Sequence, residues 1–181
     1  MRVALTGTPG TGKTTVCEPL AERLGLEGLA ITDLVESGSG FTQGYDEEYG
    51  VPEVDVEAVR EEIESEEDVL VEGHLSHLVD VDHTVVLRCR PDVLEERLSE
   101  RGYDRDKLAE NSESEALDVV LAEAVEEQGD ENVYEIDTTD KTVEETVEEA
   151  AEAVEKRESK TGVVDWIEYV RTDMSRDREE E

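Results

Sequence analysis

Residues 7–15 read Gly-Thr-Pro-Gly-Thr-Gly-Lys-Thr-Thr and have the spacing of a phosphate-binding loop. The backbone N–H groups of such a loop surround nucleotide phosphates, the lysine reaches the β- and γ-oxygens, and the next hydroxyl can bind Mg²⁺. Lys13 is therefore a candidate catalytic residue and Thr14 a candidate metal ligand. An apolar run before the loop and a helical pattern after it disfavour the alternative, a chance glycine-rich turn. The residues expected to bind ATP are Gly10, Thr11, Gly12, Lys13, Thr14 and Thr15.

Glu72 and His74 follow a second apolar run, Val69-Leu70-Val71. In a fold with a phosphate-binding loop, a carboxylate at such a strand end would hold Mg²⁺ directly or through water. The histidine would lie near the γ-phosphate, where it could position a water molecule. We therefore expect Glu72 to be a metal ligand and His74 a catalytic residue. The alternatives are a solvated carboxylate and a capping or core histidine, while His77 and His83 are expected to be structural.

Four arginines lie at the end of a further apolar run and in the helical pattern after it. They are Arg88, Arg90, Arg97 and Arg101. A guanidinium group can bind phosphate through two parallel hydrogen bonds and neutralise charge that develops during phosphoryl transfer. Arg101, beside Gly102-Tyr103, is the preferred candidate for catalysis and ATP binding. Arg90 and Arg105 are better explained as members of surface ion pairs.

Short apolar runs alternate with helical patterns along the chain. Strands are expected at about residues 2–6, 29–32, 68–72, 83–88 and 132–136, and helices at about 13–24, 55–65, 93–101, 104–128 and 142–157. This alternation predicts an α/β fold, a five-stranded parallel sheet with helices on both faces. Ligands of such sheets bind at the carboxyl ends of the strands, where residues 7–15 fall.

Three segments outside these elements carry weaker patterns. Residues 37–40, Ser-Gly-Ser-Gly, predict a flexible loop, and residues 175–181 a frayed end. Residues 163–170, which include Trp166, are expected to dock on the body of the protein or on a partner.

Acidic residues dominate the composition. The chain has 52 Asp and Glu against 17 Lys and Arg, which gives a formal net charge of −35. Because a nucleic-acid-binding surface is normally basic, direct non-specific binding to DNA or RNA is not expected. With 181 residues, 36% of them apolar, the chain can still form one domain with a core.

The same charge predicts a salt-rich setting, since at molar ionic strength a Debye length of about 3 Å screens repulsion between carboxylates. The charge is spread along the chain, which disfavours the alternative of an acidic interaction tail. No stretch approaches the ~20 apolar residues of a membrane span, and no signal-peptide pattern follows Met1. A cytoplasmic protein with no membrane partner is expected, and Cys17 and Cys89 are expected to be small core residues.

Taken together, these motifs resemble the adenylate kinase isoenzyme 6 family of archaeal and eukaryotic nucleotide kinases and ribosome-assembly ATPases. The matching segments are residues 6–15, Gly-Tyr-Asp-Glu-Glu-Tyr at 44–49, Glu72-Gly73-His74, and residues 93–103 continuing to Lys107-Leu108 and Asn111. They span about residues 2–158. Many kinases share the loop alone, but its combination with Tyr-Asp-Glu-Glu-Tyr and Glu-Arg-Leu-x-x-Arg-Gly-Tyr is specific.

The resemblance implies a P-loop domain of the nucleoside monophosphate kinase type at residues 1–158. It implies a monophosphate-binding segment near 33–59, a short lid near 101–111 and an acidic C-terminal extension at 159–181. The loop at 137–140 would lie next to adenine, which makes Thr139 a candidate ATP-binding residue.

The activity that the resemblance implies is phosphoryl transfer from ATP, with Mg²⁺, to AMP or another nucleoside monophosphate. ATP hydrolysis and a role in maturation of the small ribosomal subunit are also implied. The implied partner is a basic small-subunit ribosomal protein, which would suit an acidic surface.

Two positions depart from the family pattern. Glu72 stands where relatives usually carry Asp, and its longer carboxylate still permits metal binding. Glu36 stands where relatives tend to carry Arg, and a carboxylate cannot clamp an anionic phosphate. Two rival functions therefore stay open: a kinase of another small acceptor, and an ATP-switched assembly factor with little monophosphate turnover.

Overall fold

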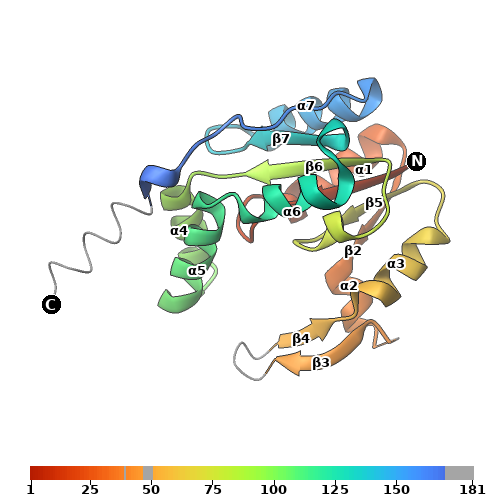
Figure 1. The fold of residues 1–181 in the computed structure, drawn as a ribbon, viewed down its shortest axis with the longest axis horizontal. Helices are drawn as coiled ribbons and strands as arrows, with labels where there is room; N and C mark the ends of the chain where they lie inside the picture. Colours follow the sequence, from red (N-terminus) through yellow and green to blue (C-terminus); the bar gives the residue numbers. More distant parts are fainter. Residues whose placement is uncertain (39, 47–50, 170–181) are drawn as a thin grey trace, which may run out of the picture.

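A parallel sheet runs through the middle of the protein (Figure 1). The computed structural model describes residues 1–38, 40–46 and 51–169, and within these ranges the sheet has five strands in the order β2-β5-β1-β6-β7. The strands are β1 Arg2–Thr6, β2 Glu27–Ala30, β5 Val69–Glu72, β6 His83–Arg88 and β7 Val133–Asp137. Each neighbouring pair is parallel, so the predicted α/β fold class is confirmed.

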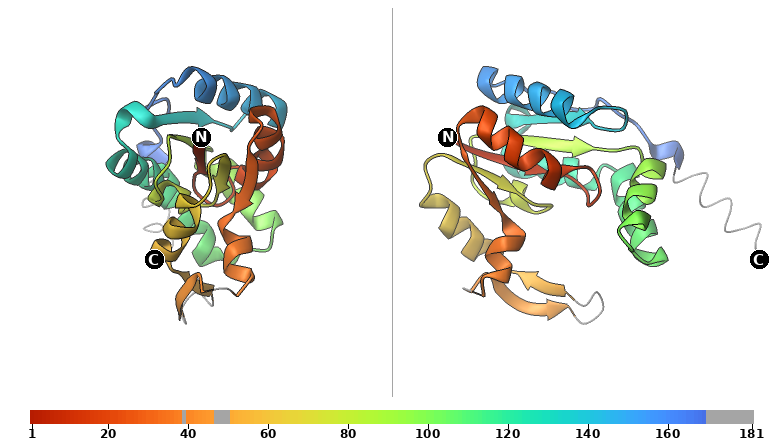
Figure 2. Two further views of the ribbon diagram at one scale, coloured as in Figure 1. Left: turned by 90° about the vertical axis from the view of Figure 1, so that its right-hand side faces the viewer. Right: turned by 180° about the vertical axis from the view of Figure 1, so that it is seen from behind.

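Helices cover both faces of this sheet (Figure 2). One face carries α1 Lys13–Leu24 and α7 Val143–Lys156, and the other carries α3 Val56–Glu64 and α6 Val119–Gln128. Because side chains alternate along a strand, neighbouring residues serve different layers. Val85 of β6 belongs to the apolar cluster under α1 and α7, whereas Val86 packs with Leu121 and Ala124 of α6.

Helices α4 Pro91–Glu100 and α5 Arg105–Ala116 follow β6, and the chain then breaks before α6. The prediction of one continuous helix over residues 104–128 is therefore wrong. Asp118 has a left-handed backbone with φ 57°, a conformation that Asp tolerates better than most residues. The break turns the Asp118 carboxylate toward the Arg88 guanidinium, whose Nη2 lies 2.5 Å from Oδ1.

The second strand begins and ends earlier than predicted. β2 covers Glu27–Ala30, and the short helix α2, Ile31–Glu36, begins where the sequence predicted the end of the strand. Ile31 is buried in the cluster that contains Val71 and Ile63, so its side chain still packs in the core. In a short apolar run, the sequence pattern does not distinguish the last residue of a strand from the first residue of a helix.

An antiparallel hairpin that the sequence analysis did not predict follows α2. It consists of β3 Thr42–Asp46 and β4 Val51–Val54, and it projects away from the central sheet (Figure 1). Phe41, next to β3, is buried and anchors the hairpin base in the cluster of α3. Residues 47–49 of the Gly-Tyr-Asp-Glu-Glu-Tyr motif, residue 50 and residue 39 of the predicted flexible loop lie outside the described ranges.

The segment after α7 returns to the sheet. Lys160 pairs with edge strand β7, since its N–H donates to the Val133 carbonyl at 3.0 Å and its carbonyl accepts from the Glu135 N–H at 2.7 Å. Trp166 lies over Arg88, with 5.2 Å from the guanidinium carbon to the ring centroid. The predicted docking of residues 163–170 on the body is thus seen up to residue 169; residues 170–181 lie outside the described ranges.

Two short 3₁₀ helices, η1 Ser76–Leu78 and η2 Asp130–Asn132, complete the described elements. Within the described residues, no helix combines the length and the apolar character that crossing a membrane requires.

Candidate functional site

The candidate residues come together because three parallel strands end at the same edge of the sheet. The loop at residues 7–12 follows β1, Glu72 ends β5, and Thr138 follows β7. Register supports this placement, since Leu5 of β1 lies opposite Glu72. The edge is the one at which open α/β sheets bind ligands.

Two glycines give the loop its shape. A Cβ on Gly7 would lie 2.3 Å from the Leu87 carbonyl oxygen, so no larger residue fits there without moving β6. Gly12 has φ 105° and caps α1, with its carbonyl accepting from Val16 N at 3.1 Å. The loop therefore ends directly on the N-terminus of α1, where backbone N–H groups and the helix dipole favour an anion.

Lys13 points into this loop. Its ammonium donates to the carbonyls of Gly7 at 2.8 Å and Thr8 at 3.1 Å, and the residue is only 8% exposed. Burial lowers the pKa of Lys13 to about 8, although the Glu72 and Glu115 carboxylates act in the opposite direction. An anionic phosphate beside the ammonium would favour its charged form and raise this pKa again.

A proton balance follows from the pKa of Lys13. Above about pH 8 the free protein carries a largely neutral Lys13, and because bound ATP favours the ammonium, binding must take up a proton. We expect calorimetry of ATP binding at pH 8.5, in buffers of different ionisation enthalpy, to show uptake of most of one proton. ATP affinity should fall as pH rises further. Equal proton uptake by Lys13→Met would contradict the assignment to this side chain.

Thr14 and Glu72 form the candidate metal site. The Thr14 hydroxyl donates to Glu72 Oε1 at 3.4 Å, and Glu72 is 6% exposed. Burial raises the pKa of Glu72, with Asp33 adding to the rise and Lys13 and the Thr14 hydroxyl opposing it. Asp33 and Glu72 line the same pocket, a proximity that sequence reasoning missed because Asp33 follows a different strand.

This donor set fits Mg²⁺. Mg²⁺ prefers hard oxygen ligands and binds through one or two protein groups together with water and phosphate oxygens. In the described ranges, no group of three or more His, Cys, Asp or Glu side chains forms a self-sufficient metal site. Thr14 and Glu72 could therefore hold Mg²⁺ only together with oxygen atoms of the nucleotide phosphates and water.

His74 follows β5, two residues after its last residue, and is exposed. Desolvation by the surrounding protein, together with the charges of Lys13 and His77, lowers the pKa of His74 to about 4. Its imidazole is therefore neutral near pH 7 and can accept a hydrogen bond from water. His77 is buried with its Nδ1 2.9 Å from the Thr6 hydroxyl, and His83 is buried in β6, in keeping with the structural roles predicted for both.

A pocket opens beside the loop and faces the start of α7. Its lining consists of Gly10, Thr11, Gly12, Thr15, Val16, Arg97, Arg101, Thr138, Lys141, Thr142, Val143 and Thr146. Four predicted loop residues and Arg101 thus line one cavity. Thr139 is not part of the lining; its hydroxyl donates to Asp137 Oδ1 at 2.5 Å and accepts from Arg90 N at 2.9 Å. The neighbouring Thr138 takes that place.

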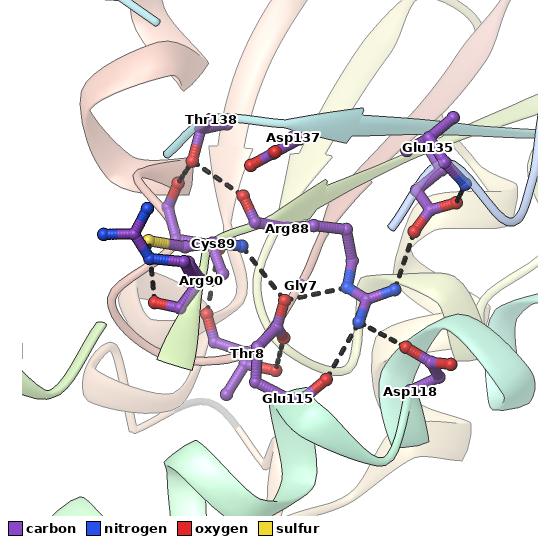
Figure 3. A network of polar contacts seen from close by, with 12 residues as sticks. Gly7, Thr8, Arg88, Cys89, Arg90, Glu115, Asp118, Glu135, Asp137 and Thr138 are labelled. Atoms are coloured by element: carbon purple, nitrogen blue, oxygen red, sulfur yellow. Dashed lines mark hydrogen bonds and ion pairs between the residues drawn. The ribbon is translucent and has the colours of Figure 1, made fainter. Parts of the chain in front are cut away.

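The arginines divide into two groups. Arg88, one of the four arginines considered for phosphate binding, is instead 1% exposed and pairs with Glu115, Glu135 and Asp118 (Figure 3). Arg90 forms the expected surface ion pair, 2.6 Å from Asp92.

Arg97 and Arg101 lie on the pocket side. Arg97 donates to the carbonyls of Gly10 and Thr138, both at 3.4 Å, and so bridges the two loops that line the pocket. Arg101 is exposed at the end of α4, and its charge contributes to lowering the pKa of Lys13. Arg101 is therefore within electrostatic range of a γ-phosphate at Lys13.

A second pocket lies on the other side of α1 and is acidic. It is lined by Thr14, Cys17, Glu18, Ala21, Glu22, Leu26, Gly28, Ala30, Asp33 and Glu72. Of the described residues that line it, four are carboxylates and none is basic. Glu36 is exposed at the end of α2. This pocket favours a cation, or an acceptor without an uncompensated phosphate.

Comparison with known protein families and with curated proteins identifies similar sequences. A family model described as an AAA domain matches residues 3–118. A "Putative adenylate kinase" of Natronomonas pharaonis is 49% identical over 175 residues, 94% of this chain and 100% of that protein. A protein of the same description from Thermococcus gammatolerans is 49% identical over 170 residues, 93% of this chain and 94% of that protein.

Solved structures share the fold at lower sequence identity. A shikimate kinase from Acinetobacter baumannii has a TM-score of 0.64 at 20% identity, covering 86% of this chain and 93% of its own. A gluconokinase from Sinorhizobium meliloti has a TM-score of 0.56 at 19% identity, with coverages of 86% and 91%. These two similarities concern the fold, which is that of P-loop kinases.

Proposed function

Since this chain belongs to the AAA-domain family and to the nucleotide kinases represented by its archaeal relatives, we propose that it transfers the γ-phosphoryl group of Mg-ATP to AMP. The observation that carries the proposal is the placement of Lys13, Thr14 and Glu72 at one sheet edge, beside the pocket that Arg101 lines. Formation of ADP from AMP and Mg-ATP, measured at molar KCl, tests it.

The residues that we assign to the reaction act mainly by position and charge. Lys13 binds the β- and γ-phosphates in place of the two loop carbonyls, and Arg101 neutralises charge on the transferring group. Mg²⁺, held by Thr14 and Glu72, would supply further charge stabilisation. The loop and the pocket at α7 hold ATP in a fixed orientation toward the acceptor.

We propose that the loop residues Gly10, Thr11, Gly12 and Thr15 bind the phosphates through their backbone N–H groups. The pocket lining supports a place for the rest of the nucleotide between Arg97 and α7. Thr139 would act there only through the conformation of its loop, since its hydroxyl is engaged with Asp137.

A kinase of another small acceptor is the second candidate, and the acidic pocket beside Glu72 favours it. Four carboxylates line this pocket, and Glu36 occupies the position where a phosphate-binding arginine is expected. An acceptor that is neutral or cationic would meet less repulsion there than AMP. Transfer to such an acceptor, with none to nucleoside monophosphates, would identify this function.

An ATP-switched factor in small ribosomal subunit maturation is the third candidate. It is supported by the net charge of −35, which suits a basic ribosomal protein as partner and a salt-rich cytoplasm as setting. This function requires ATP hydrolysis but little monophosphate turnover. Stable binding to a basic ribosomal protein, released by ATP, would distinguish it.

His74 offers a way to separate hydrolysis from transfer. Its neutral imidazole can orient water near the γ-phosphate, whereas AMP brings its own nucleophilic oxygen. We expect His74→Ala to lower ATP hydrolysis about tenfold or more, and phosphoryl transfer to AMP by less, with ATP affinity little changed. Steady-state assays of both reactions on one preparation measure the difference. Equal losses would remove the proposed role of His74 in positioning water.

A further inference from the structure

Glu115 connects a buried ion-pair network to the phosphate-binding loop, although it lies in α5, 107 residues from its loop partner (Figure 3). Its Oε2 accepts from the Thr8 hydroxyl at 2.5 Å. Its Oε1 accepts from Arg88 Nε at 2.7 Å and from Cys89 N at 3.0 Å. Glu115 is 2% exposed and Thr8 is 1% exposed, so these contacts are shielded from water.

Thr8 in turn fixes the groups that face the phosphates. Its carbonyl accepts from Lys13 Nζ at 3.1 Å and from the Thr11 hydroxyl at 2.9 Å. A movement of Thr8 would therefore move both the ammonium that reaches the γ-phosphate and the turn that supplies N–H groups. The Glu115 carboxylate holds Thr8 through its side-chain hydroxyl, whereas Lys13 contacts its backbone carbonyl.

The end of β6 holds the loop at a second point. Thr138 donates from its hydroxyl to the Arg88 carbonyl at 2.8 Å and to the Thr11 carbonyl at 2.9 Å. Residues 88 and 89 thus support Thr8 through Glu115 and Thr11 through Thr138. These two contacts fix the loop in the absence of a nucleotide. Less conformational entropy of the loop is therefore lost when a nucleotide binds.

We propose that Glu115 is a positioning residue for nucleotide binding and phosphoryl transfer, acting through Thr8 on Lys13. The inference deepens the proposed kinase function and rests on it for the transfer step. Arg88 holds the Glu115 carboxylate in place, with its Nε 2.7 Å from Oε1, because a buried carboxylate needs a partner.

Glu135 supplies a matched control. Like Glu115, it is a fully buried carboxylate that pairs with Arg88, with its Oε1 2.7 Å from Nη1. Its other oxygen accepts from Val163 N at 2.8 Å, on the C-terminal segment rather than on the loop. Loss of either carboxylate weakens the Arg88 network, but of the two only Glu115 contacts the phosphate-binding loop, through Thr8.

The test uses the full chain with Thr8→Val, Thr8→Ser and Glu135→Gln. Val keeps the shape of Thr8 and removes its donor, while Ser restores the donor. We expect Thr8→Val to raise the dissociation constant of Mg-ATP about tenfold and to lower kcat with AMP, because the loop and Lys13 lose their fixed position. Thr8→Ser should restore binding to within about threefold of wild type. Glu135→Gln should lower the melting temperature and leave the dissociation constant within about twofold.

Three outcomes decide the matter. Weaker ATP binding in Thr8→Val but not in Glu135→Gln supports the inference. Equal ATP binding in Thr8→Val and wild type, or equal loss in Glu135→Gln, overturns it. If Thr8→Val does not fold, Thr8→Val/Glu115→Gln relieves the unpaired buried charge and is measured in its place. ATP binding is read without an acceptor, so a wild type that fails to phosphorylate AMP would refute the proposed function and leave this test intact.

Discussion

Replacing Lys13 with Ala is expected to lower kcat/KM for phosphoryl transfer about 10²–10³-fold while the protein stays folded. The Lys13 ammonium donates to the carbonyls of Gly7 and Thr8 in the loop, and the side chain is not part of the apolar core clusters. Its loss removes a charge placed to meet the transferring phosphoryl group, and groups that stabilise such charge commonly contribute this much. Steady-state kinetics and thermal melting on the same preparation measure both effects.

Lys156→Ala is the matched control for this change. Lys156 is an exposed lysine of α7 that pairs with Glu152 at 3.3 Å, and such surface pairs contribute little to stability. Its activity should equal that of wild type. A folded Lys13→Ala protein with near-normal turnover would refute the assignment of residues 7–15 to phosphate binding.

Replacing Glu72 with Gln is expected to separate Mg²⁺-dependent transfer from nucleotide binding. The amide keeps the size of the buried side chain but loses the charge that attracts the cation, so kcat should fall about 10²–10³-fold. Without Mg²⁺, ATP should bind at least as tightly as to wild type, because a carboxylate near the phosphates is gone. Titration of ATP with and without Mg²⁺ measures the two effects.

Glu22→Gln is the control for Glu72→Gln. Glu22 lines the same acidic pocket but is exposed on α1, so its loss changes the local charge without removing a ligand. Its kcat at saturating Mg²⁺ should stay within about twofold of wild type. An unchanged Mg²⁺ dependence in Glu72→Gln would contradict the metal site.

The sequence predicts well those elements whose signals are local. The loop at residues 7–12 is followed by a helix at Lys13–Leu24, and β6 covers His83–Arg88, both with the predicted bounds. The glycine spacing and the apolar run suffice because each is a signal carried within a few consecutive residues. The hairpin at 42–54 escapes this reasoning, since Gly44 and Pro52, which are rare inside strands, interrupt the strand-like sequence pattern.

Tertiary contacts explain what the sequence could not predict. In the sequence, nothing distinguishes Arg88 from an exposed arginine at a strand end. Its three partners, Glu115, Asp118 and Glu135, lie in two other segments of the chain and reach it only in the folded protein. The same applies to the break at Asp118, where an ion pair overrides a continuous helical pattern. No spacing rule links Glu115 with Thr8.

The sequence predicts the phosphate-binding and metal-binding residues of the candidate site, but not every residue that lines it. Lys13, Thr14 and Glu72 were expected together and lie together, because strand ends of a parallel sheet share one edge. Asp33, Thr138 and the start of α7 join the site only through folding. Whether Thr138 or Thr139 lines the pocket depends on which side chain turns toward it. A sequence pattern does not distinguish two adjacent threonines in a loop.

Phosphoryl transfer from γ-labelled Mg-ATP to a panel of nucleoside monophosphates, at molar KCl, tests the nucleotide kinase function most directly. We predict that AMP becomes labelled as ADP, faster than ATP is hydrolysed without an acceptor, and that Lys13→Ala lowers the rate of labelling about 10²–10³-fold. Release of label only as inorganic phosphate, at a rate that no monophosphate changes, would contradict the proposed function.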